Sequence, residues 1–253
     1  MTRPWFEADW PAPHGVHALS TLRGDGRAGD AGGGISKAPY GCFNLGAHVG
    51  DDPVAVAENR RRLKVGAELP GEPVWLSQVH GIGVADLDSP AAPGPADAAI
   101  ARGPGKVCAI LTADCLPVLF ATDSGDTVAA AHAGWRGLAA GVIEATVRAM
   151  SAPPGSLMAW LGPAIGPKHF EVGPEVRDAF LAGDAKADEA FEPNSRGRFM
   201  ADLVMLARRR LQGIGVSRIY GGGNCTFTQA ERYFSHRRDG ITGRQATLIW
   251  REG

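Results

Sequence analysis

The sequence has no long apolar run. No window of the 253 residues approaches the roughly 18 consecutive apolar residues of a membrane-spanning helix. The first residues, MTRPWFEADWPAPHG, also lack an apolar core of signal-peptide length. We therefore expect neither a membrane span nor export, and we predict a cytoplasmic protein.

Cysteine is scarce and its spacing excludes a disulfide scaffold. The four cysteines, Cys42, Cys108, Cys115 and Cys225, form no close pairs and are too few to cross-link a chain of this size. We expect reduced thiols, so that each cysteine is free to serve as a small buried hydrophobe or as a ligand.

The chain also has no large excess of positive or negative charge. With 26 basic and 27 acidic residues the net charge is −1, which argues against nucleic acid or a membrane surface as a partner.

The chain lacks the GxxxxGK[ST] and GxSxG motifs of nucleotide hydrolases and α/β-hydrolases. Gly24, Gly26 and Gly29 satisfy GxGxxG, but more glycine follows instead of a helix start. A small-molecule substrate remains the best expectation.

Thirty-five glycines and eighteen prolines divide the chain into short elements, which predicts a mixed α/β (α+β) fold. The glycine-rich residues 24–34 are predicted to form a mobile surface loop, and residues 89–98 a connection inside one domain spanning 1–253. Caps and apolar periodicity predict helices that begin at Pro53 and Pro174 and others near residues 138–150 and 203–211. Apolar and alternating runs predict strands at 16–21, 74–79, 107–113, 117–121, 127–132, 157–161 and 245–250.

Residues 107–137 predict a β-hairpin with two candidate metal ligands. Two apolar runs flank the turn-forming residues 123–126, and a turn centred there pairs residue 117 with residue 132. Cys115 and His132 then lie diagonally on one face, within side-chain reach of each other. A third candidate, His80, follows the apolar segment VWLSQV just before a glycine. Three such ligands leave a tetrahedral metal one open position, which is the catalytic pattern.

Two other interpretations of these residues stay open. Cys115 is also consistent with a small buried hydrophobe, as we expect for Cys42 and Cys108. Alternatively, Cys115 is a nucleophile, His132 is its base and Asp114 orients the histidine.

Several motifs, in order and spacing, resemble the YfiH or laccase-domain family. They are NLGAHVGDD (44–52), SQVHG (77–81), LTADCLPVLF (111–120), AHAGWRGLAAGV (131–142), GPAIGP (162–167) with FEVG (170–173), and FSHRRDGITGR (234–244). The resemblance covers nearly the whole chain. It implies a single domain with mixed β-sheets in a sandwich flanked by helices, the YfiH-like cysteine hydrolase fold. It also implies a zinc ion, with copper as the alternative metal, on His80, Cys115 and His132.

The chain departs from the family pattern in two places. Arg23 precedes an expanded glycine loop, which leaves its correspondence to the family's arginine open. Lys168 and His169 follow GPAIGP, where the family often has a cysteine.

The resemblance implies a metal-dependent purine nucleoside enzyme. It would phosphorolyse adenosine, inosine and methylthioadenosine to the base and (methylthio)ribose 1-phosphate, and it would also deaminate adenosine. Guanidinium groups match phosphate oxygens, so Arg237 and Arg238 are the first candidates for phosphate binding. Arg136 and Asn44 are further candidates for substrate binding, and Asp114 and Glu171 are candidate acid/base groups.

Three other functions are alternatives to the purine nucleoside enzyme. A copper polyphenol oxidase of the multicopper type needs many histidines for its several copper ions, whereas the chain has seven. A cysteine-dependent amidase would use Cys115 and His132 without metal. A non-enzymatic, metal-stabilised binding module needs a closed four-ligand site, for which no fourth ligand is evident. For the assembly we expect a monomer or a weak homodimer.

Overall fold

The computed structural model describes residues 3–24 and 33–252. The predicted glycine-rich surface loop, residues 24–34, falls mostly outside these described residues. None of the described helices combines the length and apolar character that a bilayer span requires.

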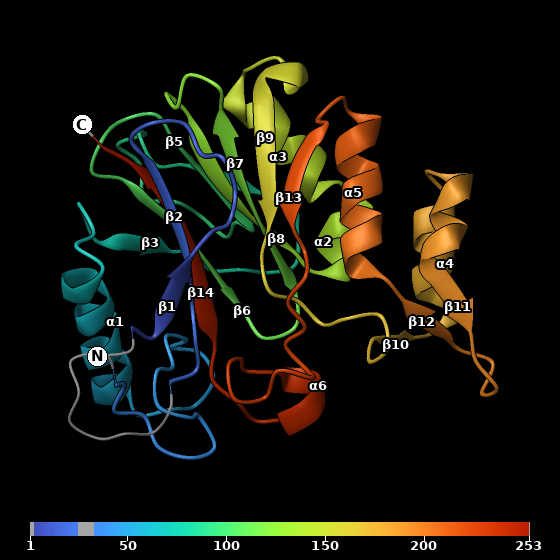
Figure 1. Ribbon diagram of the computed structural model, residues 1–253, viewed down its shortest axis with the longest axis horizontal. Coiled ribbons are helices and arrows are strands. Elements are labelled where there is room, and N and C mark those ends of the chain that lie inside the picture. Colours follow the sequence, from blue (N-terminus) through green and yellow to red (C-terminus); the bar gives the residue numbers. More distant parts are fainter. Residues whose placement is uncertain (1–2, 25–32, 253) are drawn as a thin grey trace.

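Two mixed sheets pack against each other and carry helices on their outer faces (Figure 1). The first sheet has the order β1-β2-β14-β6-β3. Its strands are β1 (Trp5–Glu7), β2 (Val16–Thr21), β3 (Pro73–Trp75), β6 (Val107–Thr112) and β14 (Gln245–Arg251). The second has the order β13-β9-β7-β8-β5-β4. Its strands are β4 (Val84–Asp86), β5 (Ala98–Ala101), β7 (Leu116–Thr122), β8 (Val128–Ala133), β9 (Leu157–Leu161) and β13 (Arg218–Gly221).

The helices form two outer layers. Helix α1 lies against the first sheet, whereas α2, α3 and α5 lie against the second, and α4 lies beyond them with a small third sheet of order β10-β12-β11 (Figure 1). The helices are α1 (Pro53–Gly66), α2 (Trp135–Ala140), α3 (Val142–Met150), α4 (Pro174–Leu181), α5 (Leu203–Gly213) and α6 (His236–Asp239), with 3-10 turns at Pro154–Ser156 and Ala185–Ala190. The third sheet consists of β10 (Glu171–Val172), β11 (Phe191–Pro193) and β12 (Phe199–Ala201). This arrangement confirms the predicted mixed sandwich flanked by helices.

The central strands are buried on both faces, which explains their continuous apolar sequence. In β6, Cys108 and Ile110 pack into the cluster between the two sheets. The alternate residues of β6 pack into a second cluster, which contains Leu63 of α1. Residues of β7 and β8 that face away from the first sheet pack instead against the outer helices.

Two predicted elements differ in extent from those observed. The helix predicted near 138–150 is divided into α2 and α3 at Gly141, whose φ of 100° ends α2 with a left-handed residue. The strand predicted at 74–79 ends at Trp75, and the chain continues as a loop in which the backbone N–H groups of Val79, His80 and Gly81 bond to the side chain of Asp97.

Candidate metal centre and its cavity

The β7–β8 hairpin brings two donor side chains together. Its register pairs Pro117 with His132, as the turn position predicts. Cys115 directly precedes β7, and His132 lies one residue before the end of β8. Along β8, His132 has the same parity as Val128 and Ala130, which pack between the two sheets. The two donors therefore lie at one end of the space between the sheets.

His80 supplies a third donor from the loop between β3 and β4. Its Nε2 is 4.0 Å from Sγ of Cys115, and its ring centroid is 4.8 Å from that of His132. One ligand atom from each of the three residues lies within 4.8 Å of the other two. In the described part of the chain this is the single His/Cys/Asp/Glu group with such spacing. The structure thus brings all three predicted ligands together.

A buried carboxylate holds two of these three donors. Asp97, which is fully buried, accepts a hydrogen bond from Nδ1 of His132 at 2.8 Å. Its carboxylate also accepts the backbone N–H groups of Val79, His80 and Gly81, at 3.1, 2.9 and 2.7 Å. These bonds fix a loop in which His80 takes the left-handed φ of 60°. Because Nδ1 of His132 faces Asp97, Nε2 is the nitrogen left for a metal.

The thiol and imidazole of the hairpin shift each other's ionisation. Burial opposes ionisation of Cys115, but the charge of His132 and hydrogen bonds from His132 and His80 prevail and lower the thiol pKa to about 6. Burial likewise lowers the pKa of His132, yet Cys115 and Asp97 outweigh it and raise that pKa to about 9. The pair favours an imidazolium facing a thiolate, which is the form of cysteine that binds metals.

The chemistry and spacing of the donors suit a zinc ion. Two imidazoles and one thiolate are ordinary zinc ligands, and donors that share a tetrahedral zinc lie about 3.5 Å apart, slightly closer than here. Gly134 leaves space between them, because a Cβ there would lie 3.0 Å from Sγ of Cys115 and 3.1 Å from Cδ2 of His80. The site therefore fits an ion after a small inward movement of its side chains.

A cavity of about 850 Å³ adjoins the three donors. Its lining comprises Ala47, His48, Arg60, Trp75, Leu76, Ser77, Gln78, His80, Leu111, Thr112, Ala113, Cys115, His132, Arg136, His236 and Arg244. Of the four residues predicted to bind phosphate or substrate, Arg136 lines this cavity, with its guanidinium 4.5 Å from the centre of the Trp135 ring.

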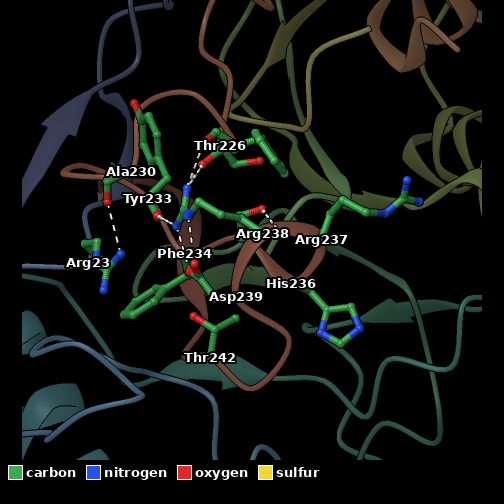
Figure 2. A network of polar contacts seen from close by, with 12 residues as sticks. Arg23, Thr226, Ala230, Tyr233, Phe234, His236, Arg237, Arg238, Asp239 and Thr242 are labelled. Atoms are coloured by element: carbon green, nitrogen blue, oxygen red, sulfur yellow. Dashed lines mark hydrogen bonds and ion pairs between the residues drawn. The ribbon is translucent and has the colours of Figure 1, made fainter. Parts of the chain in front are cut away.

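Arg238 is engaged elsewhere, in the polar network of Figure 2. Its guanidinium donates to the backbone carbonyls of Thr226, Phe227 and Tyr233 and to both carboxylate oxygens of Asp239. These contacts use all five N–H donors of an arginine. Arg238 thus secures a loop and has no donor left for a phosphate.

Arg237 and Asn44 also lie outside the lining of the cavity. Figure 2 shows Arg237 extending away from the Arg238 network, and its guanidinium donates to the backbone carbonyl of Glu171 at 2.9 Å. Asn44 is fully buried, and its Oδ1 accepts the backbone N–H groups of Gly46 and Arg244. Asn44 is therefore placed to position the backbone of a cavity residue.

The candidate acid/base residues already have partners. Asp114 has a left-handed φ of 88°, and its carboxylate accepts the Thr226 hydroxyl and the backbone N–H of Arg237. The interpretation in which Asp114 orients His132 is wrong, since Asp97 does so. Glu171 accepts from Asn194 and pairs with Arg196.

Arg23, whose role the sequence left open, donates to the backbone carbonyl of Ala230 at 3.1 Å and lies over the Phe234 ring (Figure 2). It therefore contacts the loop that Arg238 secures.

Sequence reasoning did not identify Asp97, Arg60, Arg244 or His48 as site residues. Asp97 has a local signal, because it is an acidic residue directly before the apolar strand β5. Arg60 follows the buried Asn59 on α1, so it was open to interpretation as a residue on the rim of the buried face. Arg244 and His48 lie inside motifs quoted above, at positions that no local periodicity distinguishes.

Comparisons with known proteins agree over almost the entire chain. The family model described as "multi-copper polyphenol oxidoreductase laccase" matches residues 29–252. The chain is 54% identical to purine nucleoside phosphorylase PA4543 of Pseudomonas aeruginosa, over 97% of this chain and 98% of that protein. It is 53% identical to purine nucleoside phosphorylase YfiH of Escherichia coli, over 95% and 96% of the respective chains.

Solved structures match equally completely. Protein NMB0706 of Neisseria meningitidis superposes with a TM-score of 0.92 at 46% identity, covering 99% of this chain and 100% of its own. YlmD of Geobacillus stearothermophilus gives a TM-score of 0.87 at 31% identity, covering 100% and 98%.

Proposed function

Because the chain belongs to the multi-copper polyphenol oxidoreductase laccase family, with relatives named purine nucleoside phosphorylase, we propose that it is a zinc-dependent purine nucleoside phosphorylase. Its substrates are adenosine, inosine and methylthioadenosine, and its products are the free base and (methylthio)ribose 1-phosphate. Adenosine deamination is a second activity of the same site.

One observation carries the proposal. Three convergent donors, His80, Cys115 and His132, open onto a cavity to which residues 3–24 and 33–252 contribute no carboxylate. The chain is also 54% identical to a named phosphorylase over 97% of its length. A cavity of about 850 Å³ is within the range of small-molecule sites and is large enough for a nucleoside and a phosphate together. Cationic side chains in the lining favour the anionic co-substrate.

Zinc is the metal that we propose for the three donors. A zinc ion held by two imidazoles and one thiolate would supply Lewis acidity to the reaction. Copper(II) would compete at the same nitrogen and sulfur donors because it binds such sites more tightly than zinc does. A multicopper mechanism receives no support from the described residues, which provide one three-donor group.

Phosphorolysis requires no redox partner. A phosphate oxygen forms a bond to the ribose C1′, the bond from C1′ to the purine nitrogen breaks, and its electron pair goes to the purine. The proton that hydrogen phosphate loses balances the proton that the purine gains. In deamination, water takes the place of the purine amino group, which leaves as ammonia.

The chain's own residues orient the reacting groups in this reaction. Asp97 keeps His132 and the His80 loop in place through four hydrogen bonds. Gln78 ties the same loop to β6, since its side-chain amide both donates to and accepts from the backbone of Leu111 at 2.9 Å. Such fixed surroundings lower the cost of ordering substrate and metal together.

A cysteine-dependent amidase is the second candidate, and one specific observation favours it. Cys115, His132 and Asp97 have the nucleophile, base and orienting carboxylate of a catalytic triad, and the thiol pKa is lowered to about 6. This activity would persist or increase after the metal is removed, whereas phosphorolysis would stop.

The test is an assay of zinc-loaded protein on adenosine with and without phosphate, following adenine, ribose 1-phosphate and inosine. We expect phosphate-dependent adenine release that is lost after chelation, restored by zinc, and absent in His80→Ala. If no purine nucleoside is turned over, the proposal fails. Amide hydrolysis that survives chelation but not Cys115→Ala would support the second candidate instead.

A further inference from the structure

The cavity beside the three donors has an unusually one-sided charge. Three arginines and four histidines contribute to its lining, and no aspartate or glutamate among the described residues does. Two of the histidines are the proposed metal ligands. The other basic residues of the lining are Arg60, Arg136, Arg244, His48 and His236. A lining of this kind favours an anionic ligand.

Arg244 is the most firmly held of these cations. Its backbone N–H donates to Oδ1 of the buried Asn44 at 2.8 Å, and its Nη1 donates to the carbonyls of Thr242 and Gly243 at 3.0 Å each. The stem packs on Gly46, where a Cβ would come within 2.7 Å of Cγ of Arg244. Its Nε and Nη2 have no partner within the described residues. A fixed guanidinium therefore presents free donors to the cavity.

Arg244 lines the same cavity as the three donors of the metal centre. Burial lowers the pKa of Arg244, whereas the charges of Cys115 and Asp114 raise it. No described carboxylate lies within 4.0 Å of it as an ion-pair partner. An anion held here would lie beside whatever occupies the metal position.

Arg60 reaches the same cavity from α1. Its Nε and Nη2 both donate to the carbonyl of Leu45, at 3.0 and 2.8 Å, and its guanidinium carbon lies 4.2 Å from the centre of the Trp75 ring. Stacking and hydrogen bonding leave Nη1 without a partner in the described ranges. The side chain is half-buried, so its geometry is set before any ligand arrives.

His48 lines the same cavity as Arg244 and Arg60. Burial lowers its pKa, and the charges of Arg244 and Arg60 lower it further. A neutral imidazole in a cavity with these cations adds a hydrogen-bonding group without adding repulsion.

We propose that Arg244 and Arg60, with His48 beside them, form the subsite that binds inorganic phosphate next to the metal centre. This proposal rests on the proposed phosphorylase function and adds the residues that select its co-substrate. Two guanidinium groups from separate elements offer several N–H donors to the phosphate oxygens, and such charge-assisted contacts are strong. Asn44 acts as a positioning residue, because it holds the backbone of Arg244.

Arg244→Met and Arg60→Met test the subsite, with Arg61→Met as the matched control. Arg61 lies next to Arg60 on α1, but it is exposed and pairs with Glu58. The measurements are the KM for phosphate, the KM for adenosine, and calorimetric binding of inorganic phosphate to the zinc-loaded protein. We expect each subsite variant to raise the phosphate KM about 10- to 100-fold, with the adenosine KM changed by less than about threefold. Arg61→Met should behave like the unmodified protein.

Arg244→Lys guards against a folding defect, because it keeps the charge and should restore part of the phosphate affinity. An equal rise in the KM for phosphate and the KM for adenosine would overturn the subsite. So would an unchanged KM for phosphate in both Arg244→Met and Arg60→Met. A strong preference for AMP over adenosine that disappears in Arg244→Met would also overturn it, since the residues would then hold a nucleotide's 5′-phosphate. If the protein shows no phosphorolysis at all, the calorimetry still decides: phosphate binding that depends on Arg244 keeps the subsite while the proposed function fails.

Discussion

The carboxylate of Asp97 and Nδ1 of His132 lie 2.8 Å apart in the interior of the protein, 35 residues apart in sequence. Burial raises the pKa of Asp97, but hydrogen bonds from His132, Gly81 and Val79 prevail and keep it below its usual value. An ionised carboxylate is only an acceptor, so Nδ1 of His132 must carry the proton. Asp97 therefore determines which ring nitrogen of His132 carries the proton, and it also holds the backbone at His80.

Asp97→Asn should weaken zinc binding about 10- to 100-fold, the usual effect of losing a partner that orients a ligand. Each carboxylate oxygen of Asp97 accepts two N–H groups, so either orientation of the asparagine amide turns its NH₂ toward two donors. Competition with a chromophoric chelator measures the affinity. Asp86→Asn, at an exposed ion pair with Arg102, is the control and should leave it unchanged. Equal zinc affinity in Asp97→Asn and the parent would contradict the orienting role.

Gly134→Ala should impair zinc binding without unfolding the chain. The φ of −63° at Gly134 is open to alanine, but the added methyl would lie 3.0 Å from Sγ of Cys115 and 3.1 Å from Cδ2 of His80. The matched control is Gly155→Ala, where a Cβ meets nothing within 4 Å. Zinc titration and circular dichroism together distinguish loss of the site from loss of the fold. Normal zinc affinity in Gly134→Ala would show that this space is not needed by the ion.

Cys115 should react with iodoacetamide well below the pH at which ordinary thiols do. The thiolate is the reactive form, and a pKa lowered to about 6 makes it the major form at neutral pH. In metal-free protein, the alkylation rate at Cys115 should rise through about pH 6 and change little above pH 7. Cys108, whose pKa is raised by burial and by Asp88, should stay unmodified. Peptide mass spectrometry separates the two sites, and a midpoint near pH 9 at Cys115 would contradict the thiolate assignment.

Arg238→Met should lower the free energy of unfolding by roughly 2–4 kcal/mol, since it removes the donors of three carbonyls and the partner of Asp239. Urea unfolding measures this change. The phosphate KM of the folded variant should not move. Arg237→Met, which loses one exposed hydrogen bond and the contact of the guanidinium with the Phe170 ring, serves as the comparison and should be less destabilising. A raised phosphate KM in Arg238→Met would restore the role predicted from the sequence.

Local pattern predicted the parts of the site that lie on regular elements. The hairpin register follows from one turn and two apolar runs, so the pairing of Pro117 with His132 was predictable without a structure. The position of His80 was harder, because it lies in a loop whose shape depends on Asp97. Only the family resemblance linked His80 firmly to the other two residues.

The residues that the sequence did not identify act through distant contacts. Arg60 appears as one of three consecutive arginines late in a helix, where the helix dipole alone accounts for them. Nothing local shows that Arg60 turns inward onto Trp75 while Arg61 stays exposed. Arg238 and Arg244 lie in one motif and look alike in the sequence, but their roles differ. Arg238 donates to carbonyls of the loop that it stabilises, whereas Arg244 donates to the Thr242 carbonyl and lines the cavity.

Strand β14 lies in the middle of the first sheet, between β2 and β6, although it is the last strand along the sequence. During synthesis, β2 and β6 therefore each have an unpaired edge until residues 245–251 leave the ribosome. Unpaired strand edges promote association with other chains. Arg244 directly precedes this strand. The nascent chain can therefore neither complete its first sheet nor assemble its anion-binding pocket until this last strand has been made, so an intermediate still attached to the ribosome would be inactive.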